Sequence, residues 1–131
     1  MSDRFTVTSR DGVPISIQQS GAGPALLLVH GSSLNSTASW ALVTPGLSQR
    51  FTVYAMDRRG RAPSGDVPSY SITNEANDVC AVIDAIGQPL TVLGHSYGAL
   101  ATLDALDRLH AVSRLILYEP PLMVKIGRAH V

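Results

Sequence analysis

Apolar residues follow two different patterns along this chain. Short continuous runs, such as residues 25–29, are typical of strands that are buried on both faces of a sheet. Between residues 72 and 86, apolar side chains instead recur every three or four positions, which predicts a helix packed on that sheet with a polar face that is only solvated. Together the patterns predict strands over residues 5–8, 14–19, 25–30, 51–56, 90–94 and 113–118, and helices over about 39–47, 73–86 and 97–107.

The order of these elements defines the expected fold class. Asp11 and Gly12 separate the first two short strands and are typical of a hairpin turn, so these strands should be antiparallel. The later strands alternate with helices, which implies right-handed crossovers and a parallel sheet. We therefore expect a single α/β domain with a mostly parallel sheet, an N-terminal antiparallel hairpin and helices on both faces.

The sequence Gly94-His95-Ser96-Tyr97-Gly98 joins an apolar run to an Ala/Leu-rich helix. A serine at the tip of such a strand-turn-helix junction has a strained backbone, so the residues two before and two after it must lack a bulky side chain. Glycine occupies both positions. The turn would expose Ser96 Oγ as a nucleophile, and the start of the helix would offer the Tyr97 N–H to an oxyanion.

Two further loops carry candidate chemistry. The buried run 25–29 ends in the polar loop His30-Gly31-Ser32-Ser33, in which the Ser32 N–H is placed to be a second oxyanion donor. An arginine-rich loop, residues 57–65, follows the fourth strand. A loop-bracing ion pair is the favoured interpretation of Asp57 and Arg58, and contact with substrate is the alternative.

At residues 30–33, 57–65 and 94–98 the chain resembles the α/β-hydrolase superfamily, in the branch of serine esterases, lipases, C–C bond hydrolases, thioesterases and cofactor-free haloperoxidase-like enzymes. The resemblance extends from about Phe5 to about Leu122. It implies Ser96 as the nucleophile and argues against the dehalogenase and epoxide-hydrolase branches, which attack with a carboxylate. One departure is Ala62, where the family loop usually reads Arg-Gly-x-Gly.

The resemblance also implies an acid and a general base, which follow the serine in the chain order Asp or Glu, then His. In the full fold they come after the seventh and eighth strands, and this chain is expected to lack these last strands. Glu119 is a candidate acid because it follows the sixth strand, although a local loop contact is the more frequent role for such a carboxylate. His130 is a weaker candidate base, since no strand holds it against Ser96.

The last six residues, 126–131, look like the translation of a sequencing-adapter end. We therefore expect residues 1–125 to be the N-terminal part of a single α/β-hydrolase domain and residues 126–131 to be a non-native tail. In that case His130 belongs to no site.

Several other side chains have structural interpretations that compete with functional ones. His30 is expected to brace the oxyanion loop through backbone hydrogen bonds, with substrate contact as the alternative. His95 should pack beneath the turn rather than act as the base. Trp40 and Tyr97 could line a pocket, although Trp40 is equally suited to anchoring the first helix. Cys80 is the single cysteine, so it cannot form an internal disulfide, and its position favours a buried structural thiol.

Composition narrows the expected partners. The chain is 45% hydrophobic and 15% charged, with ten basic and ten acidic residues, so its charge gives no case for binding nucleic acid or a membrane surface. No apolar run approaches the ~18 residues of a membrane span, and the start lacks the pattern of a secretory signal, so cytoplasm is the expected location. No metal cluster, phosphate loop or dinucleotide motif indicates a cofactor.

The favoured hypothesis is a serine hydrolase that cleaves an ester or related acyl bond of a small molecule through Ser96, here without its acid and base. Two alternatives remain. One is a catalytically inactive fragment or interaction module, because the sheet would end on an open apolar edge. The other is a non-hydrolytic relative, such as an acyltransferase or a cofactor-free haloperoxidase-like enzyme, which would keep the same turn and oxyanion loop.

Overall fold

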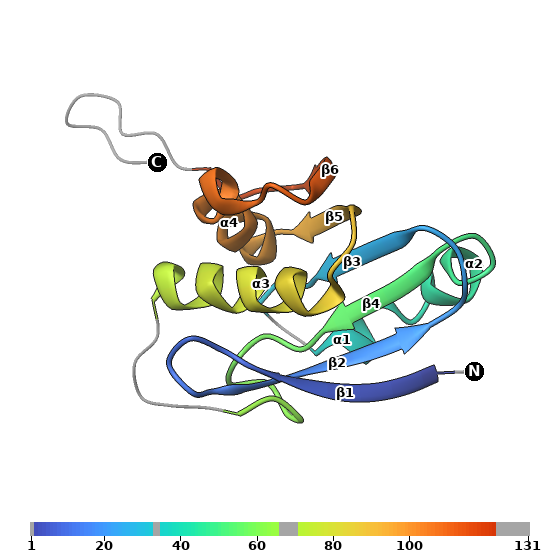
Figure 1. Cartoon of the computed structure of the whole chain (residues 1–131), viewed down its shortest axis with the longest axis horizontal. Coiled ribbons are helices and arrows are strands. Elements are labelled where there is room, and N and C mark those ends of the chain that lie inside the picture. The colour runs from blue at the N-terminus through green and yellow to red at the C-terminus, as the bar shows by residue number, and fades with distance from the viewer. Residues whose placement is uncertain (1, 33–34, 66–70, 123–131) are drawn as a thin grey trace.

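The computed structural model describes residues 2–32, 35–65 and 71–122. Figure 1 shows one sheet with helices on both of its faces. The strands are β1 (Ser2–Thr8), β2 (Pro14–Ser20), β3 (Ala25–Val29), β4 (Thr52–Met56), β5 (Leu90–His95) and β6 (Val112–Tyr118). The helices are α1 (Ser36–Trp40), α2 (Thr44–Leu47), α3 (Ile72–Ile86) and α4 (Tyr97–Asp104), and the short 3-10 helix η1 (Leu106–Arg108) follows.

The strands are ordered β1-β2-β4-β3-β5-β6 in the sheet. β2 pairs antiparallel with β1 and with β4, and the remaining pairings are parallel. At the hairpin, Gly12 has a φ of 92° and its N–H donates to the Ser9 carbonyl, so the turn uses a conformation that glycine adopts without strain. The expected fold class is confirmed, including the N-terminal antiparallel hairpin.

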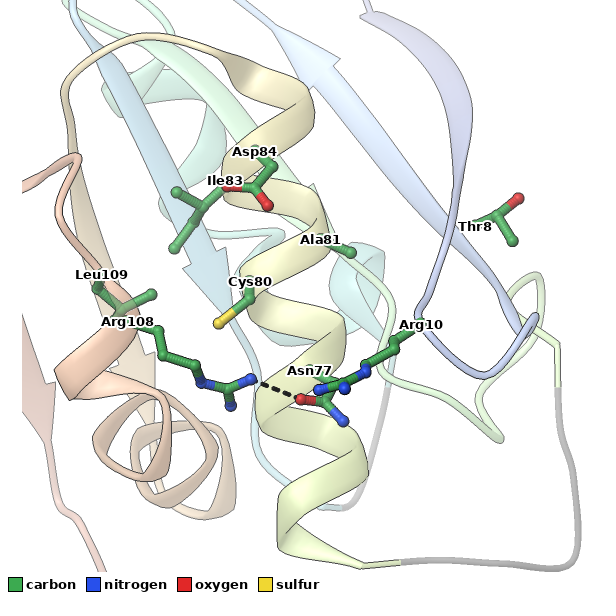
Figure 2. Close-up of a pocket in the computed structure, with 9 residues that line it drawn as sticks. All are labelled: Thr8, Arg10, Asn77, Cys80, Ala81, Ile83, Asp84, Arg108 and Leu109. Carbon is green, nitrogen blue, oxygen red and sulfur yellow. Dashed lines mark hydrogen bonds between the residues drawn. The ribbon is translucent and has the colours of Figure 1, made fainter.

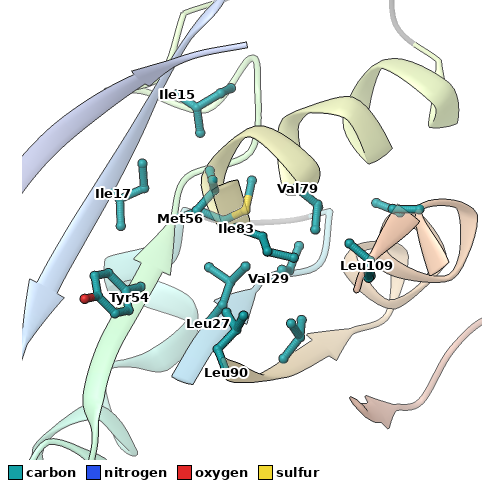
Figure 3. Packing of buried hydrophobic residues seen from close by; sticks show 14 of the residues in the cluster. Ile15, Ile17, Leu27, Val29, Tyr54, Met56, Val79, Ile83, Leu90 and Leu109 are labelled. Carbon is teal, nitrogen blue, oxygen red and sulfur yellow. The ribbon is translucent and has the colours of Figure 1, made fainter. Parts of the chain in front are cut away.

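The central strand β3 explains why helices cover both faces. Successive side chains of a strand point to opposite faces, and all five residues of β3 are buried. Leu27 and Val29 join a large cluster with α3 and α4 (Figure 3). Leu26 and Leu28 pack instead with Trp40 on the other face, where Trp40 is 7% exposed. Trp40 therefore anchors α1 to the sheet.

The single helix expected over residues 39–47 is wrong, because the structure has two short helices there. α1 begins earlier, since the Asn35 side chain accepts a hydrogen bond from the Ala38 N–H at 3.0 Å. Pro45 lies in the first turn of α2, where its missing N–H needs no partner, and its ring would clash with a helix continuing from α1. The helix expected over 97–107 is likewise shorter, ending at Asp104 before η1.

The polar face of α3 is not only solvated, and this expectation is also wrong. Glu75 and Asp78 are 4% and 1% exposed. Glu75 accepts two hydrogen bonds from Arg58, at 2.6 and 3.0 Å, and Asp78 accepts two from Arg59, both at 2.7 Å. These buried ion pairs attach α3 to the loop that follows β4.

The last strand, β6, forms an edge of the sheet. Within the described residues it pairs with β5 alone. Ile116 and Tyr118 of this strand are 49% and 55% exposed. The sheet therefore ends on a strand with exposed apolar side chains, as the sequence predicts.

Candidate active site

Ser96 lies at the junction of β5 and α4, with a φ of 54° and a ψ of −121°. A positive φ is uncommon for a residue other than glycine, and this region of backbone space is strained. The Ser96 N–H donates to the Tyr118 carbonyl at 3.0 Å, which ties the turn to β6. The turn thus has the backbone geometry expected of a nucleophile elbow.

Packing requires both glycines that flank this serine. A Cβ on Gly98 would lie 2.3 Å from the carbonyl oxygen of Val29 and 2.4 Å from that of His30. A Cβ on Gly94 would lie 2.8 Å from the Cα of Ala99. All of these neighbours are backbone atoms, so no side-chain rotation could relieve the overlap. The start of α4 therefore sits directly against the end of β3.

The loop after β3 packs on the same turn. A Cβ added to Gly31 would lie 3.2 Å from the Ser96 Cβ. The next residue, Ser32, is exposed, and its carbonyl accepts a hydrogen bond from Arg61 Nη2 at 2.8 Å. Tyr97 is the first residue of α4, so its N–H has no acceptor within the helix. The structure therefore brings the segment of Ser32 close to Ser96 and Tyr97, whereas Ser33 lies outside the described residues.

His30 is fully buried beneath this loop. Its Nε2 accepts a hydrogen bond from the Arg58 N–H at 3.1 Å, so its Nδ1 carries the proton and donates to the Gly31 carbonyl at 2.6 Å. Burial lowers the pKa of His30 from 6.5 to about 4, so the imidazole is neutral at pH 7. These contacts support the bracing role. Because His30 has no exposed surface, the alternative of substrate contact finds no support.

The arginine-rich loop carries the ion pairs that its sequence predicts, but with other partners. Asp57 pairs with Arg4 at 2.8 Å and also accepts a hydrogen bond from the Ser36 N–H at 2.7 Å. Arg58 pairs with Glu75 rather than with Asp57. The sequence-based interpretation missed the acidic partners on α3. The available signal was a pair of acids three residues apart on one helix, matching two consecutive arginines in the loop.

Ala62 does not loosen this loop. The Arg61 N–H donates to the Arg58 carbonyl at 3.1 Å, and the Ser64 N–H donates to the Arg61 carbonyl at 2.9 Å. Ser64 Oγ also donates to the Asp57 carbonyl at 2.6 Å. Two successive turns therefore close the loop although alanine replaces the usual glycine.

Glu119 and His95 lie beside the serine turn. The Glu119 side chain is 71% exposed, and its Oε1 is 4.0 Å from His95 Nε2. The His95 ring stacks on Tyr118, with 4.9 Å between ring centroids, and meets the edge of Trp40 at 6.4 Å. This arrangement agrees with the packing role expected of His95. Glu119 as the acid stays a prediction, and His130 lies outside the described residues.

A cavity of about 520 Å³ lies beside α3, and Figure 2 shows the side chains around it. Cys80 is half-buried there, and burial raises the pKa of its thiol. Arg108 Nη1 donates to Asn77 Oδ1 at 2.7 Å across the cavity. The lining residues are Thr8, Arg10, Asn77, Cys80, Ala81, Ile83, Asp84, Arg108 and Leu109. None of them surrounds Ser96, so this cavity is separate from the candidate active site.

Within residues 2–32, 35–65 and 71–122, no three His, Cys, Asp or Glu side chains lie close enough together to hold a metal ion. No helix in this part of the chain is long and apolar enough to span a membrane.

Comparison with known proteins identifies the family. The model of the Alpha/beta hydrolase family matches residues 26–130. The chain therefore belongs to the α/β-hydrolase family.

The relatives include enzymes of several kinds. A solved α/β hydrolase from Sphaerobacter thermophilus is 42% identical, with a TM-score of 0.82, and the match covers 92% of this chain and 47% of that one. The esterase RhEst1 from Rhodococcus sp. is 31% identical, with a TM-score of 0.83, covering 95% of this chain and 48% of that one. A curated Mycobacterium tuberculosis protein, named probable oxidoreductase EphD, is 34% identical over 83% of this chain and 19% of its own length.

The names of the relatives differ, and the chain covers only part of their length. Other solved neighbours are an epoxide hydrolase and a deformylase by name. The hydrolases among these relatives are therefore named for different reactions. The chain spans about half the length of the solved relatives and about a fifth of the first curated ones. Its expected place outside the epoxide-hydrolase branch stays a prediction.

Proposed function

We propose that the full-length protein is a serine hydrolase that cleaves an ester or related acyl bond of a small molecule, with Ser96 as its nucleophile. The backbone of Ser96 carries this proposal. A strained serine at the start of α4, between glycines that packing requires, is costly to maintain and is typical of a reacting residue. The esterase among the solved relatives supports the same class of reaction.

In the proposed reaction, Ser96 Oγ attacks the acyl carbonyl carbon and the carbonyl oxygen becomes an oxyanion. The N–H groups of Ser32 and Tyr97 donate hydrogen bonds to that oxyanion, and the N-terminus of α4 adds positive potential. A general base takes the Oγ proton and returns it to the leaving group as the acyl bond breaks. The same base then takes a proton from the water that attacks the acyl-enzyme and returns it to Ser96 Oγ as the acid product leaves. We assign the base and the acid to the rest of the full-length protein, since this chain spans only about half of its solved relatives, and Glu119 is the alternative acid within the chain.

The test is hydrolysis of a p-nitrophenyl short-chain ester by the full-length protein and by its Ser96→Ala variant. We expect kcat to fall by about 10⁴-fold or more, because the nucleophile is lost. Ser113→Ala, at an exposed position in β6, is the matched control and should leave turnover unchanged. Turnover that survives Ser96→Ala within twofold would refute the proposal.

Two further measurements separate the neighbouring hypotheses. The 131-residue chain should show no Ser96-dependent turnover. Robust turnover by that chain would place the acid and base within it and contradict our assignment of these groups. Adding an alcohol acceptor distinguishes hydrolysis from acyl transfer, because an acyltransferase would form the new ester faster than the free acid.

A further inference from the structure

Arg58 is buried against the turn that carries Ser96. The residue is 3% exposed, and its Nε and Nη2 donate to the Glu75 carboxylate at 2.6 and 3.0 Å. Its guanidinium carbon lies 4.5 Å from the centroid of the Tyr97 ring. Its Nη1 is buried and has no hydrogen-bond partner among the described residues. The face of the Tyr97 ring is therefore the group that stabilises the positive charge on the Nη1 side of the guanidinium. The side chain therefore has one defined position, between α3 and Tyr97.

The main chain of Arg58 is linked to the loop that contains Ser32. The Arg58 N–H donates to His30 Nε2 at 3.1 Å, and His30 Nδ1 donates to the Gly31 carbonyl at 2.6 Å. A single buried imidazole thus links residue 58 to the loop of Ser32. The two segments that contain the candidate oxyanion donors meet at one residue.

We propose that Arg58 is a positioning residue of the oxyanion hole. Its side chain fixes Tyr97, its main chain fixes Gly31 through His30, and together they set the spacing between the N–H groups of Ser32 and Tyr97. The proposal rests on the proposed function of Ser96 and deepens it. Oxyanion donors act on charge that develops only in the transition state, so their displacement lowers kcat and leaves substrate binding almost unchanged.

Lysine could not replace arginine in this role. The Glu75 carboxylate is held by two parallel N–H donors, and the planar guanidinium also lies against an aromatic face. A lysine ammonium keeps the charge, but it lacks the two parallel N–H donors and the planar group that stacks on an aromatic ring. Arg58→Lys therefore tests geometry at constant charge.

The first readout is steady-state hydrolysis of a p-nitrophenyl ester by the full-length protein. In Arg58→Lys we expect kcat to fall by about 10- to 100-fold, with KM within about twofold of wild type. The double variant Arg58→Met/Glu75→Met removes both charges, so no unpaired buried charge opposes folding, and it should show the same loss. Unchanged kcat in the double variant would overturn the proposal.

The matched control is Asp11→Asn. It removes one of the two carboxylates that bind Arg59, the neighbouring buried arginine of the same loop, and leaves the Asp78 partner in place. Because the ion pair between Arg59 and Asp11 contacts neither the Tyr97 ring nor His30, kcat of Asp11→Asn should stay within about twofold of wild type. A loss of kcat in Asp11→Asn equal to that in Arg58→Lys would show a general effect of the loop and also overturn the proposal.

The second readout, amide hydrogen exchange, needs no activity. The amides of Ser96 and of residue 58 are bonded to the Tyr118 carbonyl and to His30, and the amide of Leu27 in β3 serves as the reference. In Arg58→Lys the amides of Ser96 and residue 58 should exchange about tenfold faster relative to the Leu27 amide. In Asp11→Asn these two relative rates should equal those of the wild type. If these relative exchange rates in Arg58→Lys equal those of the wild type, the proposal is overturned. If the wild-type protein has no Ser96-dependent turnover, the proposed function fails, and the exchange ratios alone decide the role of Arg58.

Discussion

Replacing Gly98 by alanine tests whether the close approach of α4 to β3 holds Ser96 in its strained turn. The added Cβ would lie 2.3 Å from the Val29 carbonyl oxygen and 2.4 Å from the His30 carbonyl oxygen. Ordinary contacts begin at 3.4 Å, so the start of α4 and the end of β3 must separate by about 1 Å. Both atoms belong to buried residues at the C-terminal end of the central strand β3, next to the candidate active site.

The expected cost follows from two opposing effects. Overpacking of this size destabilises a folded protein by about 1–3 kcal/mol, whereas alanine is the better helix former by up to about 1 kcal/mol. We therefore expect Gly98→Ala to lower the free energy of unfolding by about 1–2 kcal/mol. Gly46→Ala is the matched control, because Gly46 lies in α2 with no atom within 4 Å of its added Cβ. That variant should be unchanged or more stable by about 0.5–1 kcal/mol.

Urea unfolding of the full-length protein, followed by circular dichroism, measures both variants. A loss of about 1–2 kcal/mol corresponds to a fall in the urea midpoint of roughly 0.5–1 M. The ester kcat of Gly98→Ala should fall as well, because Ser96 moves with the turn. If Gly98→Ala is as stable as Gly46→Ala within about 0.5 kcal/mol, the close contact between α4 and β3 does not hold the turn and the reasoning is refuted.

Two further predictions concern titratable groups. Above pH 6.5, His30 is neutral in both the folded and the unfolded state. Between pH 6.5 and about 4 only the unfolded state binds the proton, so stability should fall by about 3 kcal/mol as the pH drops through that window. His30→Asn should lose this component, and identical pH profiles of the two proteins would contradict the prediction. Because burial raises the pKa of the Cys80 thiol, DTNB should react with it about tenfold more slowly in the folded than in the urea-unfolded protein, and equal rates would count against this.

Much of the fold could be predicted because its determinants are local. The strand over residues 25–29 appears as a continuous apolar run, since both faces of this central strand are covered. The helix expected over 39–47 could not be placed correctly from periodicity, because the Asn35 cap starts α1 earlier and Pro45 lies at the start of a second helix. Hydrophobic spacing reports which side of an element is apolar and does not report where it is interrupted.

The candidate site shows the same division. The sequence by itself predicted the serine turn, because the Gly-x-Ser-x-Gly pattern lies within five consecutive residues. Only the tertiary structure shows that Gly98 is also required by the backbone of Val29 and His30, which approaches it from another part of the chain. Only the tertiary structure decided that Arg58 binds Glu75 and lies against Tyr97. The reason is physical: a charged side chain is buried only where a partner neutralises it, and that partner comes from an element elsewhere in the chain. Its identity depends on how α3, the loop after β4 and the serine turn pack together, and no local pattern records that packing.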